Sequence, residues 1–163
     1  MLTGRVWKYG DHVNTDLIIP GRYLDDYNVA NLAAHAMEDI DPAFASSVRE
    51  GDIIVAGKNF GCGSSREQAP LALKAAGVGA VVAKSVARIF YRNCINVGLP
   101  VVICKDATEM FKTGDVAEID LSAGMMRNAS TGSCIRFDPM PDFLLEVLEG
   151  GGLVPYLKER LGR

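Results

Sequence analysis

The sequence predicts an α/β fold with a parallel β-α-β-α-β core, additional antiparallel strands and C-terminal helices. Three short apolar runs, at residues 52–57, 79–84 and 99–104, read as buried strands bounded by glycine or polar residues. A helical segment lies between each pair of runs, and each of these segments ends at a glycine. Short strands alternating with single helices are typical of parallel sheets joined by crossover connections.

The N-terminal third is expected to lead into this core through a strand, a loop and two helices. Residues 2–9 read as the strand, and residues 10–28, rich in Gly, Asp and Asn, read as an ordered loop. The first helix is expected over residues 29–37, with Asn28 as its N-cap. A proline opens the second helix, which is expected over residues 42–48.

The core helices are expected over residues 65–77 and 85–98. The C-terminal third reads as short antiparallel strands followed by two amphipathic helices. The strand candidates are residues 116–121, 125–130 and 133–138. Because no linker or internal repeat divides the chain, residues 1–163 are predicted to form a single domain.

Charge and composition exclude several classes of function. The net charge is −3, so a nucleic-acid groove or a basic membrane patch is not expected. The apolar runs are too short for a membrane span, and the first residues lack a signal sequence, so a cytoplasmic protein is predicted. The four cysteines, Cys62, Cys94, Cys104 and Cys134, lack the spacing of metal ligands and are expected to be reduced, buried thiols. No bound metal is predicted.

The segment NFGCGSSREQAP, residues 59–70, can be interpreted in two ways. Ser64 and Glu67 match the S-x-x-E capping box, a common way to begin a helix. The same turn follows a buried parallel strand, where α/β sheets bind ligands, and free N–H groups at a helix start attract anions. Arg66 would add a planar guanidinium that suits a carboxylate or a phosphate, and the N–H groups would stabilise an alkoxide on Ser64. Both interpretations remain open at this point.

This segment resembles a known family when its neighbours are included. NFGCGSSREQAP, with NTDLIIPGRYL before it and SVARIFYRNCINVGLPVV after it, is similar to the small subunits of 3-isopropylmalate dehydratases. Those subunits are the swivel-domain partners in the aconitase superfamily of hydro-lyases. The resemblance covers nearly the whole chain, and it implies an aconitase-like swivelling domain. It also implies a subunit that helps to isomerise 2-isopropylmalate and 3-isopropylmalate by dehydration and rehydration, in leucine biosynthesis.

The resemblance also assigns roles to individual residues. Ser64 would remove the proton from carbon, and Ser65 and Arg66 would hold a carboxylate of the hydroxy-dicarboxylate substrate. Asp16, in NTDLIIP, would face the active site. The family's [4Fe–4S] cluster would belong to a separate large subunit, so this chain is expected to bind no cofactor itself and to act only with that partner.

The resemblance places the substrate-specificity loop at Tyr23, Leu24, Asp25 and Asp26. Asp25 would repel a third carboxylate, which disfavours a tricarboxylate substrate, and Leu24 is the candidate contact for an isopropyl group. The alternative is that Asp25 and Asp26 are solvated loop residues without a role in recognition.

The ARIFYRN segment is not assigned to catalysis. Ile89, Phe90 and Ile95 are expected in the core or at a subunit interface, and Arg88 and Arg92 are expected to pair with acidic groups or a partner subunit.

Two other functions stay open for the chain. One is a related hydro-lyase subunit for homoaconitate, citramalate or dimethylmalate, and the other is a non-catalytic anion-binding module. Self-association of the isolated chain is also left open.

Overall fold

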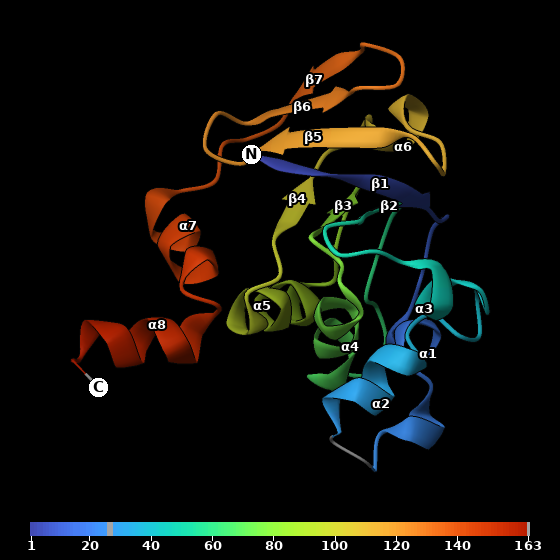
Figure 1. Cartoon of the computed structure of the whole chain (residues 1–163), viewed down its shortest axis with the longest axis vertical. Coiled ribbons are helices and arrows are strands. Elements are labelled where there is room, and N and C mark those ends of the chain that lie inside the picture. Colours follow the sequence, from blue (N-terminus) through green and yellow to red (C-terminus); the bar gives the residue numbers. More distant parts are fainter. Residues whose placement is uncertain (26–27, 163) are drawn as a thin grey trace.

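The computed structural model describes residues 1–25 and 28–162 (Figure 1). Asp26, part of the expected specificity loop, lies outside the described residues. The elements are β1 (Leu2–Lys8), α1 (Thr15–Ile18), a 3₁₀ turn (Gly21–Tyr23), α2 (Val29–Ala34), α3 (Phe44–Ser47), β2 (Ile53–Ala56), α4 (Gln68–Ala76), β3 (Ala80–Ala83), α5 (Arg88–Val97), β4 (Val101–Ile103), α6 (Ala107–Met110), β5 (Val116–Asp120), β6 (Met125–Asn128), β7 (Cys134–Arg136), α7 (Asp142–Glu149) and α8 (Leu153–Arg160).

The described strands form one mixed sheet in the order β4-β3-β2-β1-β5-β6-β7. Strands β1 to β4 pair in parallel, and β5, β6 and β7 continue the sheet by antiparallel pairing from the other edge of β1. The predicted parallel core and antiparallel C-terminal strands are therefore confirmed. β1 lies at the junction, because Val6 aligns with Ile53 of β2 while Arg5 aligns with Val116 of β5.

Side chains of the central strands alternate between two hydrophobic layers. In β2, Ile54 and Ala56 face one core with α2, α4 and α5, while Ile53 and Val55 face a second core with α6 and the antiparallel strands. All four side chains are fully buried, which explains the continuous apolar run in the sequence. Figure 1 shows α2, α4 and α5 together below the parallel strands and β5 to β7 above them.

The two C-terminal helices pack on the outer side of α5. Val147 of α7 and Tyr156 of α8 form a small separate core with Ile95 of α5. Ile95 and Phe90 are therefore core residues, whereas Ile89 is 53% exposed, so of the two expected places only a subunit interface remains for it. None of the described helices is long and apolar enough to cross a membrane.

Buried free cysteines were expected, and the structure bears this out only in part. Cys94 and Cys104 are buried, Cys62 is half-buried and Cys134 is exposed on β7. The expectation was thus wrong for Cys134, because the outermost strand of the sheet leaves its side chain in solvent.

Both core helices begin later than the sequence predicted. α4 begins at Gln68 with Glu67 as its N-cap, and no side chain caps its first turn, so the capping box of Ser64 and Glu67 is not formed. The Ser64 carbonyl instead accepts a hydrogen bond from the Thr15 hydroxyl. α5 begins at Arg88, because residues 85–87 form backbone hydrogen bonds with Phe60 instead of a helical turn.

Two further differences concern short segments. The loop of residues 10–28 contains the four-residue helix α1, which Asn14 caps by accepting from the N–H of Leu17. α2 ends at Ala34, before the expected residue 37. Its continuation is interrupted because the Met37 N–H donates to the Ile18 carbonyl, with Met37 at a φ of 61°.

Candidate functional site

Loops that follow three adjacent parallel strands meet at one cavity of about 270 Å³. The first comes after β1, the second after β2 and the third after β3, and these strands are neighbours in the sheet. The carboxyl ends of adjacent parallel strands are where open α/β sheets bind ligands. The lining residues are Thr15, Gly61, Gly63, Ser64, Ser65, Arg66, Ala87, Arg88, Ile89, Phe90 and Asn93.

Backbone hydrogen bonds fasten the first two loops together. The N–H of Gly61 donates to the carbonyl of Val13 over 2.7 Å, and the N–H of Thr15 donates to the carbonyl of Cys62 over 2.9 Å. Thr15 is 2% exposed, and its hydroxyl donates to the Ser64 carbonyl over 3.0 Å. Because donors and acceptors alternate between the two segments, the segment that carries Asp16 is held in register with the segment that carries Ser64.

The third loop is fastened to the second in the same way. The N–H of Phe60 donates to the carbonyl of Ser85, and the N–H of Ala87 donates back to the carbonyl of Phe60. The buried rings of Phe60 and Phe90 meet edge to face at 5.4 Å between centroids. This contact fixes the first turn of α5 against the glycine-rich loop.

Asp16 and Arg66 form an ion pair at the edge of the cavity. The Arg66 Nη1 atom donates to Asp16 Oδ1 over 2.5 Å. The Arg66 side chain is 19% exposed and the Asp16 side chain 63%, so the guanidinium is largely covered while the carboxylate faces solvent. Two residues fifty positions apart in the sequence are therefore brought together, as the resemblance implied for a shared site.

The loop itself presents free backbone N–H groups. No acceptor among the described residues takes a hydrogen bond from the N–H groups of residues 63–67, and Ser64 and Ser65 are exposed. Successive free N–H groups in a turn are suited to an anion or a developing alkoxide. The free N–H groups were expected at a helix N-terminus, and in the structure they belong to the non-helical turn before α4.

The expected specificity loop packs against the segment after α2, while Gly21, which begins the same 3₁₀ turn, lies beside the ion pair, where a Cβ atom would be 3.7 Å from Arg66 Nη1. The ring of Tyr23 stacks on His35 with centroids 3.8 Å apart, and its hydroxyl donates to Glu38 over 2.6 Å. Leu24 is half-buried against the larger core, and Asp25 is exposed. Neither Tyr23 nor Leu24 lines the cavity that contains Ser64.

Charged and polar groups gather around Glu38. Arg22 donates to both Glu38 and Asp39, and His35 Nδ1 lies 3.0 Å from Glu38 Oε1. Hydrogen bonds from Tyr23, His35 and Arg22 lower the pKa of Glu38 from 4.5 to about 2. Arg22 likewise lowers the pKa of Asp39.

We expect this cluster to make stability depend on pH in the acid range. Because the folded-state pKa of Glu38 is depressed, its contribution is complete above pH 4.5 and is lost as the pH falls from 4.5 toward 2. Glu38→Gln should therefore lower the Tm of the isolated chain at pH 6 by a few degrees and flatten its decline below pH 4.5. Thermal unfolding followed by circular dichroism from pH 2 to 6 measures this, with Glu159→Gln on α8 as control. If the Tm of Glu38→Gln declined below pH 4.5 as steeply as that of the wild type, the expectation would be contradicted.

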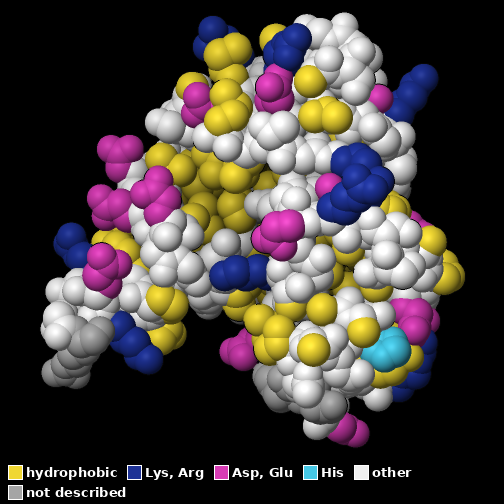
Figure 2. Space-filling view, viewed as in Figure 1, with side chains coloured by type: hydrophobic (Ala, Val, Ile, Leu, Met, Phe, Trp, Pro, Cys, Tyr) yellow, Lys and Arg dark blue, Asp and Glu magenta, His cyan; other side chains and the backbone are white. Residues whose placement is uncertain are grey.

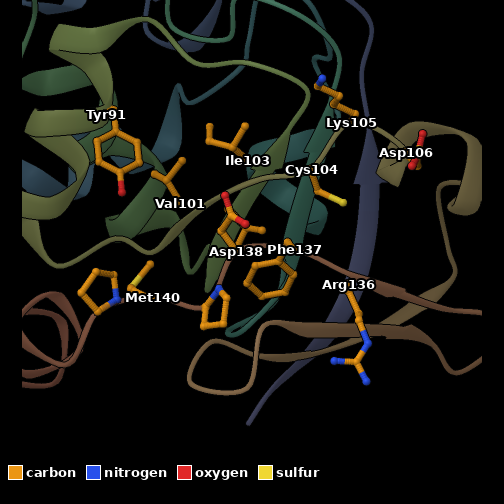
Figure 3. Close-up of a pocket in the computed structure, with 13 residues that line it drawn as sticks. Tyr91, Val101, Ile103, Cys104, Lys105, Asp106, Arg136, Phe137, Asp138 and Met140 are labelled. Carbon is orange, nitrogen blue, oxygen red and sulfur yellow. The ribbon is translucent and has the colours of Figure 1, made fainter.

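A second cavity, of about 490 Å³, lies between β4 and the segment after β7. Figure 2 shows a hollow with a hydrophobic floor in this area, between α7 and β4. In the close-up of Figure 3, Tyr91 and Met140 lie at one end, Arg136 lies at the other and Asp138 lies between them. None of the expected site residues that the structure describes lines this cavity.

Of the expected site residues, the structure brings together Ser64, Ser65 and Arg66 around one cavity, with Asp16 bonded to Arg66. The sequence reasoning did not single out Thr15 or Asn93. Thr15 stands between Asn14 and Asp16 in the NTD motif, and Asn93 ends the ARIFYRN segment, so both lie within motifs already recognised. Within the described parts of the chain, no three His, Cys, Asp or Glu side chains are grouped so that they could hold a metal ion.

The fold and this cavity define an α/β domain that presents serine hydroxyls, an arginine and free N–H groups at the ends of parallel strands. Comparison with known proteins agrees. Residues 11–106 match the family model described as the aconitase C-terminal domain. The matched segment includes all three loops of the cavity. The chain therefore belongs to the aconitase C-terminal domain family.

Individual relatives cover almost the entire chain. The 3-isopropylmalate dehydratase small subunit of Halothermothrix orenii is 57% identical over 96% of this chain and 95% of its own length. The methanogen homoaconitase small subunit of Methanothermobacter thermautotrophicus is 59% identical over 97% of this chain and 92% of its own length. A crystal structure of 3-isopropylmalate dehydratase from Methanocaldococcus jannaschii superposes with a TM-score of 0.92 at 49% identity. It covers 98% of this chain and 95% of the other.

Proposed function

We propose that this chain is the small subunit of a hydro-lyase that isomerises 2-isopropylmalate and 3-isopropylmalate by dehydration and rehydration. The observation that carries the proposal is the shared cavity of Ser64, Ser65 and Arg66, with Asp16 paired to Arg66. Relatives named as dehydratase small subunits support it, at identities above 50% and over nearly the full length. The reaction is a step of leucine biosynthesis.

In the proposed mechanism, Ser64 accepts the proton from the carbon next to a carboxylate. A serine hydroxyl is far too weak a base unless its alkoxide is stabilised. The free N–H groups of residues 63–67 are suited to that task, because none of them donates to an acceptor among the described residues. In the reverse direction the protonated Ser64 returns the proton to carbon.

Arg66 and Ser65 hold a carboxylate of the substrate beside that carbon. Proton removal builds negative charge on the adjacent carboxylate, and a guanidinium offsets it through two parallel hydrogen bonds. Asp16 orients Arg66 through their 2.5 Å contact, so the planar fork presents its remaining donors to the cavity.

The remaining half of the active site is proposed to come from a large subunit that carries the [4Fe–4S] cluster. When bound, that cluster supplies a Lewis acid for the substrate hydroxyl. The names of the relatives as small subunits support the existence of a partner. We further propose that residues 1–163 act as one swivel-type domain in the cytoplasm.

Replacing Arg66 by lysine should damage both substrate binding and turnover. Lysine keeps the charge but cannot form two parallel hydrogen bonds to a carboxylate while also contacting Asp16. We expect KM of the assembled enzyme to rise about 10-fold and kcat to fall. Steady-state kinetics measure both, with Arg127→Lys, an ion-paired surface arginine on β6, as control. Kinetics equal to those of the control would remove Arg66 from the site.

Reconstitution tests the function directly. The chain is assembled anaerobically with its cluster-loaded large subunit and assayed with isopropylmalate, citramalate and homocitrate. We expect conversion of isopropylmalate. If an assembled, cluster-loaded complex converts none of these acids, the hydro-lyase proposal fails and an anion-binding module replaces it.

A related substrate is the second candidate, because a relative at 59% identity is named a homoaconitase small subunit. Asp25 is exposed just after the 3₁₀ turn and its C-cap Leu24, where its charge would oppose a third carboxylate. Preference for homocitrate in the assay would show that Asp25 does not discriminate and would favour this candidate.

A further inference from the structure

We propose that Arg88 is a second substrate-binding arginine, which contacts a carboxylate in the cavity that Arg66 also lines. This inference rests on the proposed function and adds a residue to its site. Arg88 is the first residue of α5, and it comes from the loop after β3, whereas Arg66 comes from the loop after β2. The two arginines therefore approach the same cavity from different strands.

The charge balance of the cavity favours this role. Among the described residues that line the cavity, Arg66 and Arg88 carry a charge and none is a carboxylate. The charge of Arg66 is already balanced by Asp16 at 2.5 Å. The Arg88 side chain, in contrast, has no ion-pair or hydrogen-bond partner within residues 1–25 and 28–162. It thus supplies the net positive charge that a dianionic acid needs on entry.

Packing fixes where Arg88 stands. Phe90, two residues along, is 2% exposed and locked against Phe60, and the Ala87 N–H is bonded to the Phe60 carbonyl. The backbone on both sides of Arg88 is therefore held by the glycine-rich loop that carries Ser64. The side chain itself is exposed and free to reach a ligand. Asn93, one turn further on, is half-buried and lines the same cavity.

The same helix offers a matched control. Arg92 follows Arg88 by four residues and is also exposed, but it does not line the cavity. Removing either arginine changes the charge of α5 by the same amount. Only a direct contact with the ligand should separate the two variants, because long-range attraction would respond to both.

The test measures binding of two acids to the assembled complex with its large subunit. Malate represents a hydroxy-dicarboxylate and lactate the matching hydroxy-monocarboxylate, and calorimetry gives each Kd without requiring turnover. We expect Arg88→Ala to raise the Kd for malate about 10-fold or more and the Kd for lactate by less than about 3-fold. Arg88→Lys should recover part of the loss, and Arg92→Ala should stay within about 2-fold of the wild type.

Three results would overturn the proposal. The Kd for malate could be the same in Arg88→Ala as in Arg92→Ala, or Arg88→Ala could weaken the binding of malate and lactate equally. Either result would exclude a specific carboxylate contact. Failure of both Arg88→Ala and Arg88→Gln to assemble with the large subunit would assign Arg88 to the subunit interface instead. A wild-type complex that binds malate but converts no substrate would refute the proposed function and leave the result for Arg88 standing.

Discussion

Ser64→Ala is expected to reduce turnover of the assembled enzyme by about a thousand-fold or more while leaving assembly intact. The variant removes the oxygen that would accept the proton from carbon. It leaves the backbone of the loop in place, because the structural contact of Ser64 is made by its carbonyl, which accepts from Thr15. Since Ser64 is exposed and does not cap α4, the Tm of the isolated chain should hardly change. Turnover is measured anaerobically, and assembly by size-exclusion chromatography.

The comparison that decides this prediction is with Ser122→Ala, an exposed serine in the turn between β5 and β6. That variant should keep normal turnover. If Ser64→Ala also keeps near-normal turnover, Ser64 is not the base. If instead it loses stability, a structural role for the hydroxyl would have to replace the catalytic one.

Gly61→Ala is expected to destabilise the chain by about 2–5 kcal/mol and to abolish most activity. Gly61 has a φ of 79°, in the left-handed region that L-residues avoid. A Cβ atom there would lie 2.2 Å from Cγ of Phe90. Phe90 cannot retreat, because it is 2% exposed and packed on Phe60. The loop that carries Ser64 would have to shift away from Val13, whose carbonyl accepts the Gly61 N–H.

Gly132→Ala provides the control for backbone strain alone. Gly132 has a similar φ of 84°, but a Cβ atom there would meet nothing within 4 Å. Thermal unfolding should show a loss of roughly 1 kcal/mol for Gly132→Ala and a clearly larger loss for Gly61→Ala. Equal losses in the two variants would show that the close approach of Phe90 does not constrain the loop.

The strands of the core were predictable from the sequence for a simple physical reason. Strands buried on both faces need apolar residues at every position, and β2 and β3, within the runs 52–57 and 79–84, satisfy this. The run 99–104 is also apolar, although it forms the edge strand β4, in which Ile103 is 46% exposed. Helix starts were less predictable. Ser64–Glu67 and residues 85–87 have helical or capping composition, but the Ser64 carbonyl bonds to Thr15 and residues 85–87 bond to Phe60, and local composition carries no record of those partners.

The site was predictable only in part. The resemblance indicated Ser64, Arg66 and Asp16, and the structure places all three at or beside one cavity. The resemblance could not show that Tyr23 stacks on His35 and donates to Glu38, because these contacts join segments that only the folded chain brings together. Nor could spacing along α5 separate Arg88 from Arg92, since facing a cavity depends on how the helix is rotated against the sheet.

The position of β1 between the two halves of the sheet has a consequence for the order in which the chain can fold during synthesis. β1 can pair with β2 once about a third of the chain has emerged, and the four parallel strands are complete at Ile103. Its other edge must wait for β5, since Arg5 pairs with Val116. Until then one edge of the nascent sheet stays open to water and to other chains, a known cause of aggregation. Shielding of that edge by a chaperone during synthesis would therefore serve this protein most before residue 116 is made.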